Sequence, residues 1–440
     1  MSSAATQSYH GAALPRAEAS ALQEIERSLQ ASGQLQPGEA IPVARQGQSA
    51  AEAGNISLAI ENNTVVALSL RYCDLAALPH SLNQLTHLRW LDLTGNRLVA
   101  LPNSLGNLTR LEKLSLDGNQ LAALPEWLAA LSQLQELHAD HNRLTALPEW
   151  MGRLSNLSVL SIYGNNIIAI PDSLGQLSGL TALSIGHNHL TALPESLWRL
   201  TNLQLLNVAE NRLTALSERI GNLTRLHTLD IGHNELTALP ASLGDMSHLT
   251  YFLYIHNNHL TTLPDSLGNL SKLRYLNASD NHLTTLPGTI GRLTSLRELR
   301  LYNNQLTTLP NSLGNLTNLL ELHAMNNRLA TLPDSLGSLA HLKELHLSNN
   351  RLAALPDSVG DLAWLARLDL RNNRLMALPE SLGTLNRLAF LDLRANRLVA
   401  LPESLGDLPS LEKLDLRWNK LASRPAWFER LEQRGYRVLT

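Results

Sequence analysis

The sequence predicts an α/β repeat fold, a curved solenoid with a parallel sheet on its concave side and short helical or 3₁₀ segments on its convex side. Two series of residues carry this prediction. Leu-Pro pairs recur every 23 residues, as at positions 78, 101, 124 and 147, and an Asn recurs at the same step from Asn96 to Asn419. Both series slip once, by one residue, and the slip in the Asn series falls between Asn234 and Asn258. A chain of 440 residues would ordinarily form about two to four domains, but a repeat of this length predicts a single array.

Each unit contains the elements of one coil, as the stretch LTHLRWLDLTGNRLVALPNSLGN illustrates. Leu91 and Leu93 alternate with polar residues, which is the period of a short strand with both Leu side chains inward. Pro102 then ends strand pairing, because proline lacks an N–H and fixes the backbone. The SLGNL segment is expected to return the chain in a short helical or 3₁₀ turn. Each coil buries its leucines only against adjacent coils.

The recurring Asn is predicted to be structural. Where the chain bends, backbone N–H and C=O groups lie inside without sheet partners, and a buried amide can bond both kinds of group. Cys73 takes the Asn position of the first unit and is expected to be buried there. A single Cys excludes an intramolecular disulfide, and a buried thiol does not fit a catalytic role.

The two ends depart from the repeat. Residues 1–55 are rich in Ala, Ser, Gln and Gly, and are predicted to form a flexible leader with a short helix on which Leu22, Ile25 and Leu29 share one face. The repeat array is predicted over residues 56–423. Residues 424–440 are predicted to form a C-terminal cap, in which a helix and a short strand cover the last leucine layer with Trp427, Phe428, Leu431 and Tyr436.

Composition and motifs exclude several classes of function. The net charge of −3 gives no reason to expect nucleic acid, and no apolar run is long enough to insert into a membrane. The N-terminus has no charged segment followed by an apolar one, so no cleavable signal peptide is expected. No phosphate-binding, hydrolase, metalloprotease or kinase motif is found, so we expect neither an enzyme nor a cofactor. His side chains beside Glu298, Glu321 and Glu344 could suggest zinc, but these side chains are expected to diverge, and no metal site is predicted.

The unit resembles the leucine-rich repeat, whose pattern L-x-x-L-x-L-x-x-N/C-x-L is followed here by L-P-x-S-L-G-x-L. About sixteen units of this type resemble the bacterial and plant-intracellular Ras-group repeats. They are also similar to the repeat portion of effectors that plant-associated bacteria deliver by type III secretion, which begin with a similar Ser/Ala/Gln-rich leader. The resemblance implies a protein-binding module located in the cytoplasm, or secreted into a host cell without a cleavable signal. Some relatives carry a ubiquitin ligase or another catalytic domain beside the repeats, whereas none is expected after the cap here. A substrate-recognition part of an enzyme system and a signalling scaffold remain alternatives.

Outward positions of the predicted strands lie six, four and two residues before each ladder Asn, and residues of interface type gather there in the middle of the chain. We predict that a protein partner, of unknown identity, binds on the concave face at these positions: Phe252, Tyr254, His256, Tyr275, Arg300, Tyr302, His323 and Met325. The alternative is that these side chains pack across neighbouring strands for stability alone. The slip lies just before this group, where three residues instead of two separate Leu249 from Leu253, and a bulge is expected to turn aromatic side chains outward there. Drift without function is the alternative.

Charged residues form two further columns toward the C-terminus. Asp369, Asp392 and Asp415 make up one column, and Arg371, Arg394 and Arg417 make up the other. Opposite charges in adjacent columns predict a self-neutralising, solvated stripe. A recognition strip for a charged partner is the alternative. The sequence makes no prediction of oligomeric state.

Overall fold

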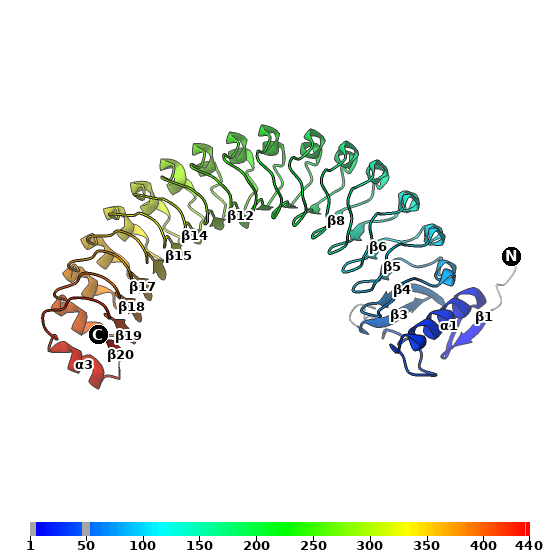
Figure 1. The fold of residues 1–440 in the computed structure, drawn as a ribbon, viewed down its shortest axis with the longest axis horizontal. Coiled ribbons are helices and arrows are strands. Elements are labelled where there is room, and N and C mark those ends of the chain that lie inside the picture. Colours follow the sequence, from blue (N-terminus) through cyan, green and yellow to red (C-terminus); the bar gives the residue numbers. More distant parts are fainter. Residues whose placement is uncertain (1–5, 46–52, 436) are drawn as a thin grey trace. The chain divides into compact units, whose positions relative to one another are not determined.

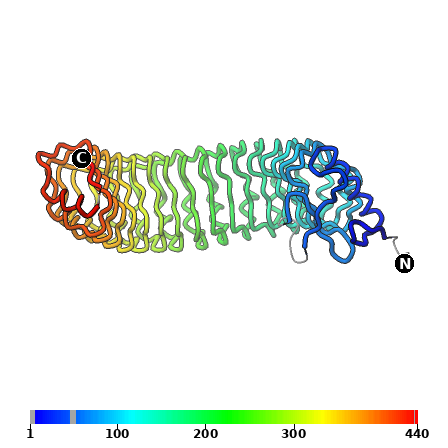
Figure 2. The backbone as a smooth tube through the Cα atoms, turned by 90° about the horizontal axis from the view of Figure 1, so that it is seen from below, coloured from blue at the N-terminus to red at the C-terminus, as the bar shows by residue number. Residues whose placement is uncertain are grey.

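The computed structural model describes residues 6–45, 53–435 and 437–440. The chain divides into two compact units, residues 1–211 and 212–440, and each is a stack of similar coils. Figure 2 follows the coils through each stack. Within each unit the strands line the inner side of the curve and 3₁₀ helices line the outer side (Figure 1). These are the elements predicted for a leucine-rich solenoid.

The first unit has an N-terminal hairpin and helix, followed by its sheet. Strand β1 (Thr6–Tyr9) pairs antiparallel with β2 (Ala12–Pro15), and helix α1 (Arg16–Ala31) follows directly. Antiparallel pairing joins β3 to β4, and the strands from β4 to β10 then pair in parallel, each with the next. The sheet strands are β3 (Ile56–Glu61), β4 (Thr64–Leu70), β5 (Trp90–Asp92), β6 (Lys113–Ser115), β7 (Glu136–His138), β8 (Val159–Ser161), β9 (Ala182–Ser184) and β10 (Leu205–Asn207).

The second unit is built from the same kind of coil. Its strands pair in parallel from β11 to β20. They are β11 (Thr228–Asp230), β12 (Phe252–Tyr254), β13 (Tyr275–Asn277), β14 (Glu298–Arg300), β15 (Glu321–His323), β16 (Glu344–His346), β17 (Arg367–Asp369), β18 (Phe390–Asp392), β19 (Lys413–Asp415) and β20 (Arg437–Leu439). The register matches equivalent residues of successive coils, so each outward position forms a column along the sheet.

Short 3₁₀ helices occupy the outer side of both units. In the first unit they are η1 (His80–Gln84), η2 (Asn103–Asn107), η3 (Glu126–Ala130), η4 (Glu149–Arg153), η5 (Asp172–Gln176) and η6 (Glu195–Arg199). In the second they are η7 (Glu218–Asn222), η8 (Ala241–Asp245), η9 (Asp265–Asn269), η10 (Gly288–Arg292), η11 (Asn311–Asn315), η12 (Asp334–Ser338), η13 (Asp357–Asp361), η14 (Glu380–Thr384) and η15 (Glu403–Asp407).

The Leu-Pro and Ser-Leu-Gly motifs have separate roles in these helices. Proline caps the N-terminus of nearly all of them, and Ser217, which replaces it before η7, accepts a hydrogen bond from the Arg219 N–H instead. Glycine is needed because successive helices pack closely. A Cβ atom at Gly291 would collide with the carbonyl oxygen of Ser312 in the next coil.

The ladder Asn residues join adjacent coils, as Asn281 illustrates. Its Oδ1 accepts a hydrogen bond from the Leu260 N–H of the preceding coil at 3.0 Å. Its Nδ2 donates to the carbonyl of Ile255 in that coil at 2.9 Å and to Ser279 in its own coil at 3.0 Å. The side chain is 4% exposed, so these bonds satisfy backbone groups that water does not reach. Cys73 occupies the equivalent buried position in the first coil, where burial raises the pKa of its thiol to about 12.

The N-terminal segment differs from the flexible leader that the sequence predicts. Helix α1 buries Leu22, Ile25 and Leu29, and its Glu18 accepts a hydrogen bond from the Val65 N–H of β4 at 2.8 Å. Glu26 accepts one from the Ile41 N–H at 3.0 Å, in a stretch predicted to be linker. Residues 6–45 therefore pack as an ordered part of the first unit, because two buried carboxylates find backbone partners there. The predicted linker extends over residues 46–52, which lie outside the described part of the chain.

A helix and a strand end the second unit. Helix α3 (Trp427–Gln433) buries Trp427, Phe428 and Leu431, and β20 pairs in parallel with β19. Both elements cover the last coil, which would otherwise expose a leucine layer and a sheet edge. Tyr436, which was also expected here, lies outside the described residues.

The extra residue before β12 leaves the sheet register unchanged. Phe252 pairs with Thr228 on one side and with Tyr275 on the other, as the regular coils would require. The Arg274 N–H donates to the carbonyl of Thr250, whereas in a regular coil the Arg297 N–H donates to the residue equivalent to Tyr251. The surplus is thus absorbed just before the strand, and Tyr251 and Phe252 are 46% and 40% exposed.

Removing one ladder amide should destabilise the second unit. Asn281→Ala leaves the Leu260 N–H buried without its partner and removes one of the two amide donors to the Ile255 carbonyl, the other being Asn258. The free energy of unfolding should fall by about 1–3 kcal/mol. Urea denaturation of the full chain measures this change. Thr284→Ala, at an exposed position of the same coil, is the matched control. An equal loss in both variants would contradict the role given to the amide.

Candidate functional site

A group of aromatic rings lies on the inner face of the second unit, across β12 and β13. Phe252 stacks on Tyr254 with ring centroids 5.6 Å apart, and Tyr275 approaches Phe252 at 5.5 Å and Tyr254 at 5.2 Å. The His256 ring lies 5.9 Å from that of Tyr254. These four residues and Arg300 are called the aromatic cluster below. Alternation along the strands places them outward, because Leu253 and Leu276 between them are fully buried.

Arg300 joins the cluster to the charged residues beside it. Its guanidinium lies 5.4 Å from the Tyr275 ring centroid, within the range of a cation–π contact. Its Nε donates to Glu298 Oε1 at 2.6 Å. Burial raises the pKa of Tyr275 to about 12, and burial followed by the Asp230 carboxylate raises the pKa of Tyr254. Both phenols are therefore neutral hydrogen-bonding groups at ordinary pH.

His323 lies one coil further along, between carboxylates and a second imidazole. Its Nε2 is 3.0 Å from Glu321 Oε2 and 3.9 Å from Glu298 Oε1, and its ring stacks on His346 at 4.7 Å. Glu298, Glu321 and His323 thus offer atoms within 4.8 Å of one another, a separation that could hold a cation. Arg300 already supplies a positive charge to Glu298, so the group is satisfied as it stands.

The structure places the other predicted residues beside the cluster. Tyr302 and Met325 follow β14 and β15, in the column nearest the C-terminal ends of the strands, and both are half-buried. Tyr251, which the slip predicted to turn outward but which was not among the predicted binding residues, extends the cluster on the other side. Its ring contacts His227 at 5.1 Å and lies 5.9 Å from the guanidinium of Arg274. The inserted residue between Leu249 and Leu253 was the feature of the sequence that pointed to Tyr251.

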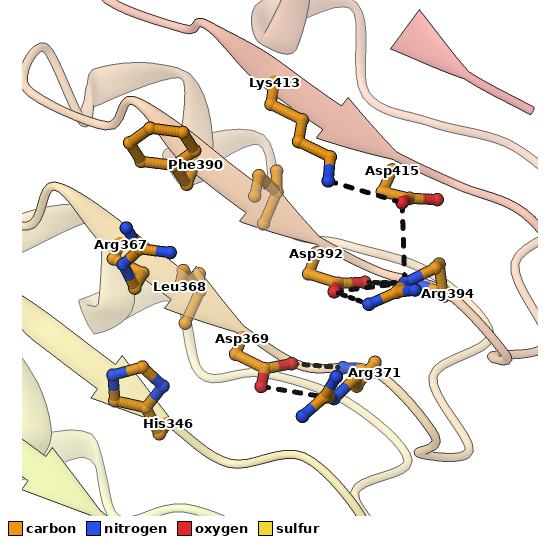
Figure 3. A pocket seen from close by; sticks show the side chains of 11 residues that line it. His346, Arg367, Leu368, Asp369, Arg371, Phe390, Asp392, Arg394, Lys413 and Asp415 are labelled. Carbon is orange, nitrogen blue, oxygen red and sulfur yellow. Dashed lines mark hydrogen bonds and ion pairs between the residues drawn. The ribbon is translucent and has the colours of Figure 1, made fainter. Parts of the chain in front are cut away.

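The charged columns line a hollow of about 440 Å³ near the end of the sheet, drawn in Figure 3. Arg394 lies 2.6 Å from Asp392 and 3.4 Å from Asp415, and Arg417 lies 2.8 Å from Asp415. Although burial opposes it, these arginines hold the pKa of Asp415 below its ordinary value. The predicted self-neutralising stripe is thus formed by ion pairs. Arg367 lies over the ring of Phe390 at 4.5 Å, and both residues also line the hollow.

Comparisons with known proteins identify the repeat. The family model described as "Leucine-rich repeat region" matches residues 63–210, 187–273, 264–344 and 332–433. A leucine-rich repeat protein of Leptospira interrogans is 34% identical, with 84% of this chain and 94% of that chain covered and a TM-score of 0.78. A TDR receptor is 29% identical over 81% of this chain and 68% of its own, with a TM-score of 0.68.

YopM from Yersinia enterocolitica is also similar, at 29% identity and a TM-score of 0.58, with 76% of this chain and 65% of that chain covered. The comparison with curated proteins found no match. Among the described residues, no helix has the length and apolar character needed to cross a membrane.

His323 should make stability depend on pH. Burial, followed by the adjacent His346, lowers its pKa below 6.5 even though Glu321 opposes this. The unfolded chain therefore takes up this proton at higher pH than the folded chain does. As the pH falls below 6.5 toward the folded pKa, the free energy of unfolding should decrease. In His323→Gln this part of the decrease between pH ~7 and pH ~5.5 should disappear, as measured by urea denaturation. His282→Gln, at an exposed position, is the control, and an unchanged slope in His323→Gln would refute the assignment.

Proposed function

The chain belongs to the leucine-rich repeat family, and we propose that it is a non-enzymatic module that binds a partner protein on the inner face of its sheet. Arrays of this kind typically act as interaction scaffolds, because stacked coils present an extended surface without needing a pocket. We place the centre of that surface at the aromatic cluster, with Tyr302, His323 and Met325 beside it. A signalling scaffold or the substrate-recognition part of an enzyme system would use the same surface.

The observation that carries this proposal is a group of partly exposed rings that contact one another across two adjacent strands of the sheet. Phe252 is 40% exposed although leucines fill the core of every coil. Aromatic residues, Met and Arg are enriched where protein interfaces are fully desolvated, and truncating one such anchor commonly costs about 2 kcal/mol or more. Packing for stability alone would not require rings of this size on the outer surface of the strands.

Pre-ordering is the mechanism by which this surface would bind. The rings already contact one another at 5.2 to 5.6 Å, and Glu298 holds Arg300 against Tyr275. A partner therefore meets side chains whose rotamers are largely fixed, and less conformational entropy is lost on binding. Both tyrosines are protonated at neutral pH, and their raised pKa values extend this to higher pH, so each can donate a hydrogen bond to a partner.

Two tyrosines should separate binding from folding. Tyr254→Ala combined with Tyr302→Ala should weaken partner affinity at least tenfold, by about 1.4 kcal/mol or more, while the melting temperature changes little. The partner is first captured from host and bacterial lysates with the parent chain, and its affinity for both chains is then measured with purified proteins. Trp364→Ala removes a ring that is 41% exposed elsewhere in the same unit and serves as the control. Equal affinity of the double variant and the parent would refute the site.

We further propose that the protein acts as a secreted effector. The resemblance of its repeats to those of type III effectors and the Ser/Ala/Gln-rich composition of residues 1–55 support this. Residues 1–55 fused to a reporter should enter host cells from a secretion-competent strain, whereas residues 56–110 fused in the same way should not. Failure of the 1–55 fusion would count against an effector role and would leave the binding proposal unaffected.

A further inference from the structure

A row of cations runs along one edge of the second unit, outside the inner face. Each member directly follows a ladder Asn, and all are exposed: Arg328, Arg351, Arg374, Arg397 and Lys420, here called the basic row. Among the described residues, none of the five takes part in an ion pair. The arginines of the inner face differ, because Arg371, Arg394 and Arg417 each pair with an Asp. Like charges in successive coils repel one another, so the basic row is a surface that an anion would stabilise.

Backbone hydrogen bonds fix the spacing of this row. The N–H of Arg351 donates to the carbonyl of Leu329 at 2.9 Å, and Arg374 donates in the same way to Leu352. Arg397 and Lys420 repeat the pattern with Leu375 and Leu398, at 2.9 and 3.0 Å. Each residue of the row is thus tied to the coil before it. The cations stay in single file at about the separation of neighbouring strands, roughly 4.8 Å.

A second row lies beside the first and is apolar. The Leu that follows each of the four arginines is fully buried, and Leu421 after Lys420 is half-buried, so the residue after that Leu points to the same side as the cation. These residues are Ala330, Ala353, Met376, Val399 and Ala422, here called the apolar row, and all are exposed. Met376 and Val399 are 59% and 53% exposed, which is unusual for side chains of this kind.

We propose that the two rows bind an amphipathic helix of a partner protein, with an acidic stripe on the basic row and an adjacent apolar stripe on the apolar row. Spacing favours a helix. One helical turn rises about 5.4 Å, so acidic residues one turn apart drift from the row by only about 2.4 Å over its length, which a flexible Arg side chain can absorb. Alternate residues of an extended peptide lie about 6.7 Å apart and would drift by more than 7 Å. Duplex DNA carries a charge every ~1.7 Å along its axis and does not match the row.

Neighbouring acids argue against a flat anionic surface. Asp334, Asp357, Glu380 and Glu403 are exposed at the starts of η12 to η15, seven residues after the ladder Asn of each coil. An anionic lipid surface broad enough to cover the row would approach these carboxylates and be repelled. A helix about 10 Å wide can lie on the two rows beside them. An anionic polysaccharide would also leave the apolar row without a partner, because such a polymer lacks a hydrophobic stripe.

The test uses two designed peptides of about 20 residues, long enough to form isolated helices. In one, Glu and Leu occupy adjacent stripes that recur every turn, and the other has the same composition in scrambled order. Fluorescence anisotropy with the full chain should show at least tenfold tighter binding of the striped peptide. Binding should weaken as salt is raised. Arg351→Ala/Arg374→Ala/Arg397→Ala, and separately Met376→Ser/Val399→Ser, should each weaken binding of the striped peptide at least tenfold.

Three controls make the outcome decisive. Lys272→Ala/Arg292→Ala/Lys343→Ala removes as many exposed cations from the same unit outside the row and should bind the striped peptide like the parent. Tyr254→Ala/Tyr302→Ala should also bind it like the parent, which separates this edge from the inner face. The proposal is overturned if both peptides bind equally, or if the triple Arg variant keeps the affinity of the parent. It is equally overturned if polygalacturonate, or vesicles of three parts phosphatidylcholine to one part phosphatidylserine, bind the row more tightly than the striped peptide.

Discussion

The buried Asn amide is the interaction on which the rest of each unit depends. In every regular coil its oxygen accepts a backbone N–H from the preceding coil, and its nitrogen donates to carbonyls of both coils, as at Asn281 and Asn304. Leucine packing is not directional and would tolerate coils that slide or rotate. The amide accepts one geometry only, because its donors and acceptor must reach fixed backbone groups. It therefore sets the register between coils, and the register decides which residues become neighbours on every surface.

Because the register is fixed, residues that differ between repeats at equivalent positions lie next to one another on the surface and determine its local chemistry. On the inner face, equivalent positions hold rings at β12 and β13, Glu with His at β15 and β16, and Asp at β17 to β19. The residues in the neighbouring columns then determine whether each of these groups is already paired within the protein. Arg394 and Arg417 form ion pairs with Asp392 and Asp415. The rings of the aromatic cluster instead contact one another, the Arg300 guanidinium and the adjacent rings of His233 and Tyr251. The charged groups of the hollow are accordingly paired with one another, and this is why the proposed binding surface is the aromatic cluster and not the hollow.

The sequence predicted the periodic features of the fold well, because the same residue type recurs at the same position of many coils and has the same local environment in each. The strands, the 3₁₀ turns and the outward columns followed from Leu, Pro and Asn spacing alone. The packing of the N-terminal segment could not be predicted in this way. It depends on single long-range contacts, such as that of Glu18 with Val65, and these do not recur in the sequence. Strand β3 was missed although Asn62 and Asn63, with φ of 48° and 59°, form a two-residue turn typical of a hairpin. The alternation of Leu with other residues along each strand predicted that the site residues face outward. It could not predict that Phe252, Tyr254 and Tyr275 contact one another, because those contacts depend on side-chain rotamers.

The residue before each ladder Asn explains why the edge of the coil is so regular. His233, Asn257, Asp280, Asn303 and Asn326 all have φ near +50°, a left-handed conformation that Asn, Asp and His tolerate better than most residues. This bend ends the strand and aims the next residues along the side of the coil, where Arg328 and its equivalents lie. The exposed amides at the bend also bond from coil to coil, Asn326 to Asn303 and Asn349 to Asn326 at 2.6 Å. The edge is thus stiffened by a second amide ladder at the surface, and charges carried on it cannot spread apart to relieve their repulsion. A rigid row of like charges is stabilised by a ligand whose own charges recur at a matching interval, more than by mobile salt ions.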